Sequence, residues 1–232
     1  MSILYMMEKD KRITLSIKYI LDKLVAITAL IITSPLFVVI AVILKIQREE
    51  VFYLQKRLGQ YGHEFRVYKF TTMPKGSEKL GLITTSQDTR PTQFGRLLRK
   101  TKLNELPQLI NVLRGDMSFI GPRPIIKEQM EESLTPLEIR EYYSMRPGIT
   151  GIASLIFHHE DRLLATVADP RTFYNTSLMP RKRKLEKKYA ENWSLRLDFK
   201  ILYYTLAILV WDSLGINVDI SMKLNILAAD DI

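Results

Sequence analysis

Cysteine is absent from the 232 residues, which excludes disulfides, thiolate nucleophiles and cysteine-ligated metals. Histidine is scarce as well, since the chain has three, and a structural zinc site is not expected. Two of them, His158 and His159, are adjacent, and we expect their side chains to point in different directions and to share no metal. The reactive groups that remain are carboxylates and hydroxyls.

Acidic residues are in the minority. The 34 Lys and Arg outnumber the 25 Asp and Glu, giving a net charge of +9 and an isoelectric point near 9.6. Such a balance indicates polyanionic partners, namely nucleic acid, anionic lipid headgroups or nucleotide phosphates. Aromatic residues gather near the C-terminus rather than among the basic groups, so we do not expect nucleic acid to be the partner.

Charged residues are missing altogether from residues 24–44, which are apolar apart from two Thr, one Ser and Pro35. This length is enough to cross a hydrocarbon layer of about 30 Å. The run begins about two dozen residues into the chain and lacks a small-x-small cleavage site, so a cleavable signal is not favoured.

The centre of this run is a Ser-Pro step, and proline bends or breaks a helix because it lacks the amide hydrogen. Both flanks are basic, with Lys11 and Arg12 before the run and Lys45 and Arg48 after it, and basic flanks favour the cytoplasmic side. A bent, re-entrant helix that enters and leaves by the same face satisfies both observations. An ordinary kinked spanning helix stays open as the alternative.

Beyond this helix the pattern changes to short β-prone runs at residues 51–54 and 65–70, separated by a turn that contains Gly59 and Gly62. This predicts a β-hairpin. The polar segment 74–87 predicts a loop, which is a candidate lid.

The densest group of basic residues lies in residues 94–124, FGRLLRKTKLNELPQLINVLRGDMSFIGPRP. We expect Asn104 to cap a helix whose first turn holds Glu105, with free amide groups that receive an anion. The helix is predicted from apolar residues at helical spacing, which are Leu106, Leu109, Ile110 and Leu113.

Residues 98–124 resemble the catalytic block of the bacterial monotopic phosphoglycosyl transferases, the bacterial sugar transferases. The string MRPGITG at 145–151 matches a second block of that family, and residues 51–59, 68–73 and 88–100 are similar to others. One position departs from the pattern, because Asn104 stands where the family has the Asp of an Asp-Glu dyad.

The resemblance implies transfer of a sugar 1-phosphate from a UDP-sugar to polyprenyl (undecaprenyl) phosphate, with release of UMP, as the first step of a surface glycan or exopolysaccharide. In the family the Asp attacks the β-phosphate, and the neighbouring Glu, here Glu105, helps to hold Mg²⁺. A carboxylate at this position suits Mg²⁺, which prefers one or two carboxylates together with substrate phosphate oxygens. Carried over by position, the catalytic pair is Asn104 and Glu105, and the substrate-binding residues are Arg57, Lys69, Arg90, Arg96, Arg99, Arg123 and Arg146, with Gln55 and Gly59 lining the site.

Asn104 is not a nucleophile comparable to aspartate, because its side chain is a neutral amide. Four explanations stay open: an introduced substitution that disables the enzyme, a natural enzyme with Glu105 or Asp116 as nucleophile, direct transfer without a covalent step, or an inactive binding protein. The alternative to an enzyme is therefore a catalytically silent, membrane-attached protein that binds nucleotide-sugar or serves as a scaffold.

Toward the C-terminus we expect a helix over 128–143 broken at Thr135-Pro136, a turn at 146–151, a basic run at 181–188 and an interfacial helix at 195–214. The aromatic residues expected at headgroup depth are Trp193, Tyr203, Tyr204 and Trp211.

The expected fold is α+β and mostly helical, with a re-entrant membrane helix in residues 1–48, a catalytic domain in 49–215 and a tail in 216–232. The resemblance places the protein on the cytoplasmic face of the inner membrane, against anionic lipid. A homo-oligomer is compatible with the sequence.

Overall fold

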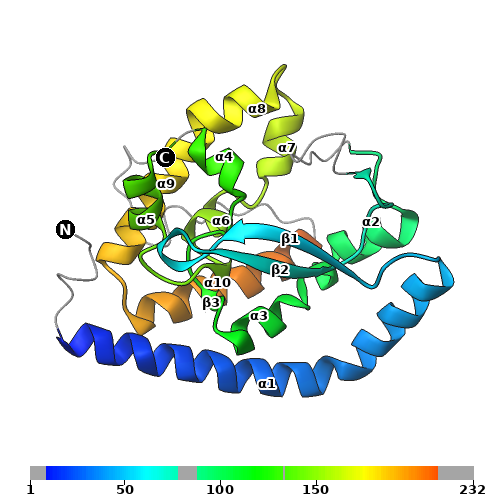
Figure 1. The fold of residues 1–232 in the computed structure, drawn as a ribbon, viewed down its shortest axis with the longest axis horizontal. Coiled ribbons are helices and arrows are strands. Elements are labelled where there is room, and N and C mark those ends of the chain that lie inside the picture. The colour runs from blue at the N-terminus through cyan, green and yellow to red at the C-terminus, as the bar shows by residue number, and fades with distance from the viewer. Residues whose placement is uncertain (1–8, 78–87, 133, 214–232) are drawn as a thin grey trace.

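The structure, a computed structural model, describes residues 9–77, 88–132 and 134–213. Helices dominate and two small sheets lie among them (Figure 1), which confirms the expected α+β class. In chain order the elements are α1 (Lys9–Ile46), β1 (Phe52–Leu58), η1 (Gln60–Gly62), β2 (Glu64–Phe70), α2 (Gln93–Lys100), η3 (Leu103–Glu105), α3 (Gln108–Arg114), β3 (Ser118–Ile120), α4 (Lys127–Glu131), α5 (Pro136–Tyr142), β4 (Gly148–Thr150), α6 (Ile152–Ile156), α7 (Glu160–Ala165), α8 (Pro170–Phe173), the π-helical η4 (Tyr174–Leu178), α9 (Met179–Glu191) and α10 (Leu195–Ser213).

Helix α1 is long and apolar enough to cross a membrane, and it bends as it runs along one side of the molecule (Figure 1). Pro35 lies inside the helix and has no amide hydrogen to offer the carbonyl of Ile31. The hydroxyl group of Ser34 takes over this acceptor at 2.8 Å, and Thr33 donates to the carbonyl of Ala29 at 2.7 Å. The Ser-Pro step therefore bends the helix without ending it, because side-chain hydroxyls satisfy carbonyls near the bend.

Both halves of α1 pack against the rest of the protein. Leu15 belongs to a core with residues of α6, α9 and α10, Ala26 packs with α3, and Ile40 and Leu44 pack with residues of β2 and α2. The opposite face is apolar and open, with Ile32 72% exposed. The helix thus presents one face to the protein and a hydrophobic face outward along its whole length.

Lys18, which lies in the basic stretch before the apolar run, is buried in the structure. Its side chain is 3% exposed, and its ammonium group lies 3.3 Å from Asp198 on α10 and 3.4 Å from Asp22. It also donates to the hydroxyl of Ser118 and, at 3.2 Å, to the carbonyl of Ile120. Lys18 therefore joins α1 to β3 and α10, because a buried ammonium group needs acceptors around it.

The predicted hairpin is confirmed, with β1 longer than the run 51–54 predicted. The strands are antiparallel and pair Phe52 with Phe70 and Leu58 with Glu64. The tight connection places Tyr61 at φ 59°. The candidate lid, residues 78–87 of the predicted loop, lies outside the described residues, as does the predicted tail.

The turn expected at 146–151 is wrong, because Gly148–Thr150 forms strand β4, parallel to β3. Neither Gly148 nor Gly151 has a positive φ. What Gly148 supplies is space, since a methyl group there would lie 2.2 Å from the backbone nitrogen of Gly121. Glycine is therefore required here because two backbone segments cross closely, and not because of an unusual backbone angle.

The remaining helix predictions hold in outline. The break before Pro136 is confirmed, with Thr135 and Glu138 forming a capping box. Helix α10 follows the predicted range, but Trp193 is 4% exposed and donates to Asp198 at 3.2 Å, so it is a core residue and not an interfacial one. The outward apolar stripe of α10 consists of Phe199, Tyr203, Leu206 and Val210, so Tyr203 is exposed as expected, whereas Tyr204 and Trp211 pack against the core.

Candidate functional site

The Asn104-Glu105 step lies in the 3₁₀ turn η3, which begins after Lys102 in the left-handed conformation at φ 58°. The prediction that Asn104 caps the next helix is wrong, because the N-cap of α3 is Pro107 and makes no side-chain bond. Asn104 is 8% exposed, and its carbonyl oxygen Oδ1 is buried without a hydrogen-bond partner. A buried acceptor without a donor is costly, so this amide is a point where a ligand group can bind.

The amides at the start of α3 are occupied, contrary to the expected anion site. The N–H of Leu109 donates to the carbonyl of Leu106 at 3.1 Å, and that of Ile110 donates to Pro107 at 3.0 Å. Because the turn before α3 runs directly into the helix, its own carbonyls use these donors. These two amides are therefore not free to receive a phosphate.

Glu105 forms an ion pair with Lys69 at the end of β2. The Oε1 atom lies 2.9 Å from Nζ, and the two side chains are 26% and 24% exposed. Burial alone would raise the pKa of Glu105, but Lys69 and Arg123 outweigh it and lower the pKa to about 2. Burial lowers the pKa of Lys69 more than Glu105 raises it. Glu105 is thus a fixed negative charge at neutral pH.

Arg123 brings a guanidinium group to this charge, and Arg57 lies beside Arg123 and Lys69. The hairpin and the Gly-Pro-Arg-Pro loop are tied together, because Arg57 donates to the carbonyl of Pro124 at 3.1 Å and the N–H of Leu58 donates to Ile125 at 2.9 Å. Burial and then the neighbouring Arg123 lower the pKa of Arg57 to about 10. Two cations that repel each other in a partly dry site favour an anion between them.

Arg123 itself is held by its backbone. The hydroxyl group of Tyr143 donates to the carbonyl of Arg123 at 2.9 Å and accepts from the N–H of Ile125 at 2.8 Å. The Arg123 side chain is open to solvent. Desolvation would lower the pKa of Arg123, but the carboxylates of Glu160 and Glu105 outweigh it and raise the pKa.

Arg99, on α2, lies at the edge of this group. Its Nε donates to the hydroxyl of Thr72 at 3.0 Å, and Glu105 is among the charges that act on it. Arg90 forms an ion pair with Asp88, and Arg96 donates to the carbonyl of Pro91 at 2.8 Å. The structure thus brings Arg99 towards Glu105, whereas Arg90 and Arg96 contact the segment before α2.

Arg146 contacts a different part of the chain. Its guanidinium group lies 4.0 Å from the ring centroid of Tyr19 on α1, and its backbone N–H donates to the Tyr19 hydroxyl at 3.2 Å. A methyl group at Gly115 would lie 3.5 Å from the Nη1 atom of Arg146. Arg146 therefore faces the membrane helix and the end of α3.

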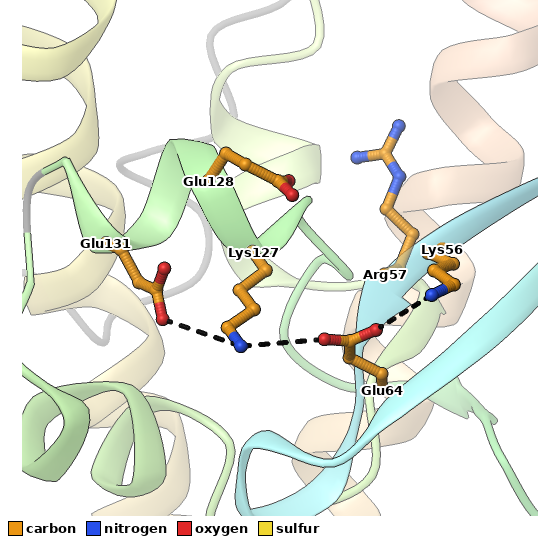
Figure 2. A pocket seen from close by; sticks show the side chains of 6 residues that line it. All are labelled: Lys56, Arg57, Glu64, Lys127, Glu128 and Glu131. Atoms are coloured by element: carbon orange, nitrogen blue, oxygen red, sulfur yellow. Dashed lines mark ion pairs between the residues drawn. The ribbon is translucent and has the colours of Figure 1, made fainter.

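One hollow of about 270 Å³ lies between β1 and α4. Of the predicted site residues it includes Arg57, whose guanidinium points away from the chain of ion pairs that joins Glu131, Lys127, Glu64 and Lys56 (Figure 2). These ion pairs span 3.7–3.9 Å and involve exposed side chains, so they stabilise little. The Arg57 guanidinium instead donates to the side-chain oxygen of Gln55, at 3.1 Å from Nε and 2.6 Å from Nη2.

Asn111 is a residue that sequence reasoning missed. It is fully buried, accepts from the N–H of Tyr68 at 3.0 Å and donates to the carbonyl of Arg66 at 2.7 Å. It thereby fixes α3 against β2 and sets the separation of Glu105 and Lys69. The available signal was a lone amide inside the apolar string LINVL, because a polar group on a buried face has to be bonded.

No group of three or more His, Asp or Glu that could hold a metal occurs among residues 9–77, 88–132 and 134–213. The rings of His158 and His159 lie 3.9 Å apart, so the expectation that they point in different directions is wrong. A metal at Glu105 would therefore need further oxygen atoms from a ligand.

Comparison with known proteins gives a family assignment. The family model described as bacterial sugar transferase matches residues 13–212. The chain is 35% identical over 193 residues to a UDP-N-acetylgalactosamine-undecaprenyl-phosphate N-acetylgalactosaminephosphotransferase of Aeromonas hydrophila, covering 82% of this chain and 43% of the relative. It is 32% identical over 202 residues to the exopolysaccharide production protein ExoY of Sinorhizobium fredii, covering 80% and 81%.

A third relative is the UDP-glucose:undecaprenyl-phosphate glucose-1-phosphate transferase of Xanthomonas campestris pv. campestris, 36% identical over 194 residues, covering 81% of this chain and 37% of the relative. The chain therefore spans less than half the length of the Aeromonas and Xanthomonas proteins and most of the length of ExoY.

Proposed function

Because the chain belongs to the bacterial sugar transferase family, we propose that it transfers a sugar 1-phosphate from a UDP-sugar to undecaprenyl phosphate and releases UMP. The observation that carries this proposal is that Lys69 and Arg123 act on the ionised Glu105, with Arg57 beside both of these cations. Glu160 also acts on Arg123 but is already paired with Lys182, so three cations against Glu105 leave an excess of positive charge. Such an excess suits a diphosphate, whose transferred phosphoryl group needs charge stabilisation and positioning.

Asn104 decides the route of the reaction. An aspartate here would attack the β-phosphorus of the donor, whereas the neutral amide has no charge to do so. In direct transfer, an oxygen of undecaprenyl phosphate attacks the β-phosphorus, the bond from that phosphorus to the bridging oxygen breaks, and UMP leaves with the electron pair. Arg57 and Arg123 hold the phosphoryl group during this exchange.

Asp116 is a poor candidate for the nucleophile. It accepts from the amide of Asn111 at 3.3 Å and lies 3.4 Å from the Nε of Arg114. Glu105 precedes the first residue of α3 and Asp116 follows its last, and seven helical residues span about 10 Å. Asp116 thus belongs to the far end of α3.

Mg²⁺ fits the residues at the Asn104-Glu105 step. Glu105 is ionised at neutral pH and the Oδ1 of Asn104 is an orphaned buried oxygen, while Mg²⁺ prefers one or two protein oxygens together with substrate phosphate. Glu105 and Asn104 would hold the ion, with Lys69 exchanging its contact to Glu105 for donor phosphate. When bound, Mg²⁺ supplies positive charge that offsets the charge of the diphosphate.

We assign the protein to the cytoplasmic face of the inner membrane, where α1 is re-entrant. Leu15 and Leu44 lie near opposite ends of α1 and both pack against the globular part. A helix that crossed a bilayer of about 30 Å would carry one end away from that part. The open apolar faces of α1 and α10 suit contact with lipid.

The test is release of UMP from UDP-sugars in the presence of undecaprenyl phosphate and Mg²⁺, by this chain and by Asn104→Asp. We expect Asn104→Asp to release UMP at least about 10²-fold faster, because losing a covalent nucleophile typically costs more than that. Glu191→Gln, an exposed change on α9, is the control.

A second candidate is a membrane-attached protein that binds nucleotide-sugar without turnover, and the amide at position 104 is the observation that favours it. Binding of UDP-sugar with no UMP release by either chain would select this candidate. Slow release by the parent chain and faster release by Asn104→Asp would select the transferase.

A further inference from the structure

The loop that carries Arg123 crosses the loop that carries Arg146 at backbone contact. The N–H of Gly148 donates to the carbonyl of Pro122 at 3.0 Å, and a methyl group at Gly121 would lie 2.2 Å from the carbonyl oxygen of Arg146. No side chain separates the two loops at this crossing. The backbone pairing at this crossing, and any group that supports it, therefore set the spacing of the two arginines.

Glu186 on α9 lies directly beneath it. The side chain is 2% exposed, and neither carboxyl oxygen has a hydrogen-bond partner. A methyl group at Gly151, the N-cap of α6, would lie 3.6 Å from Oε1. The backbone N–H groups of Ala153, in the first turn of α6, and of Arg123 act on the carboxyl group without meeting the geometry of a hydrogen bond. A fully buried carboxyl group without a bonded partner calls for an explanation.

We infer that Glu186 is a positioning residue whose carboxyl group supports the crossing from beneath and fixes the spacing of Arg123 and Arg146. It reaches the first turn of α6 on one side and the Arg123 backbone on the other. Its consequence for donor binding rests on the proposed function, whereas its role in the crossing does not.

Glu186 does this as a neutral acid. Burial raises its pKa to about 8, although the N–H of Ala153 and the nearby Lys182 act in the opposite direction. The charge of Lys182 is already paired with Glu160, so a charged Glu186 would lack a compensating partner. The titratable groups around Glu186 are Lys182 and Tyr189 on α9, Glu160 on α7 behind Lys182, and the hydroxyl groups of Tyr142 and Tyr143 at the end of α5.

Three variants separate these properties. Glu186→Gln keeps the shape and removes the ability to ionise, Glu186→Leu keeps the approximate volume and removes the polar atoms, and Glu191→Gln is an exposed control on the same helix. All three retain the packing volume of their sites, so each is expected to fold.

Hydrogen exchange of the backbone amides measures the local stability of the crossing without any ligand. In residues 121–125 and 149–156 we expect the amides of Glu186→Leu to exchange about tenfold faster than those of the parent chain. We expect Glu186→Gln and Glu191→Gln to exchange at the rate of the parent chain. Equal exchange in the parent chain and Glu186→Leu would overturn the inference.

The pH dependence of the melting temperature tests whether the carboxyl group of Glu186 is neutral in the folded protein. The folded pKa of Glu186 lies above its ordinary value of 4.5, so its contribution to stability falls as pH rises from 4.5 to about 8 and is constant above that. We expect Glu186→Gln to lose this part of the decline and Glu191→Gln to keep it. If stability declines with pH in Glu186→Gln as it does in the parent chain, the inference that Glu186 is neutral in the folded protein is overturned.

UDP affinity at pH 7, measured by calorimetry, tests the consequence for donor binding. We expect Glu186→Gln to stay within about twofold of the parent chain and Glu186→Leu to bind UDP about tenfold more weakly, the equivalent of about 1.4 kcal/mol. Equal weakening by both would show that the charge is needed and overturn the inference. If UDP fails to bind even the parent chain, the proposed donor site fails, and exchange and melting still decide the role of Glu186.

Discussion

Replacement of Lys69 by methionine tests the electrostatics of the site directly. Methionine keeps most of the length of the side chain and removes the ammonium group that lies 2.9 Å from Glu105. Glu105 then keeps its burial, which acts to raise the pKa, and loses the nearest cation that lowers it. We expect the pKa of Glu105 to rise and the folded state to lose stability at neutral pH.

The magnitude follows from the pKa of Glu105. The difference between the ordinary value of 4.5 and about 2 corresponds to about 3 kcal/mol at 1.4 kcal/mol per pKa unit. Removal of Lys69 also removes a desolvated ammonium group, which returns part of this energy. We therefore expect a net loss of about 2 kcal/mol in the free energy of unfolding, or a fall of about 4–8 °C in the melting temperature.

The pH dependence gives the sharper test. Because the folded pKa of Glu105 lies below its ordinary value, its contribution is present above pH 4.5 and is lost as pH falls towards 2. The contribution of Glu105, and with it the difference in stability between the parent chain and Lys69→Met, should therefore shrink by pH 3, the contribution to about two fifths of its value at pH 7. Tryptophan fluorescence in detergent, recorded during heating at pH 7 and pH 3, measures it.

Lys56→Met is the matched control, since Lys56 lies on the same hairpin, is 73% exposed and sits 3.7 Å from Glu64. We expect it to change the free energy of unfolding by less than about 0.5 kcal/mol. The reasoning is refuted if Lys69→Met and Lys56→Met melt alike at pH 7. It is equally refuted if the loss in Lys69→Met is the same at pH 7 and pH 3.

Two further predictions concern the metal and the membrane. Glu105→Gln should remove most of the Mg²⁺ dependence of UDP-sugar binding, because it removes the ionised oxygen ligand; an unchanged Mg²⁺ titration by calorimetry would reject Glu105 as a ligand. Tags placed before Lys11 and after Arg48 should both be protected from reagents outside sealed cells, because a re-entrant α1 keeps both ends inside; labelling of either tag would indicate a spanning helix.

Local sequence alone determined several elements. The Ser34-Pro35 step specifies the bend of α1, because proline removes one amide and a neighbouring hydroxyl group can bond the freed carbonyl. Thr135 before Pro136 specifies the start of α5, and alternating β-prone runs specify the hairpin. These features depend on interactions within a few residues, which is the range that sequence patterns describe.

The tertiary structure decided which polar groups are buried and which basic groups meet. Lys18 contacts Ser118, one hundred positions away, so a lysine of the basic stretch before the apolar run is a core ion. The motif that carries Arg146 was expected to line the site around Glu105, but Arg146 faces Tyr19. The parallel pairing of β3 and β4 fixes the direction of the chain at this point. Burial depends on contacts between distant segments, and no local pattern specifies them, so the surroundings of Glu105 and Glu186 came from the fold and not from the motif.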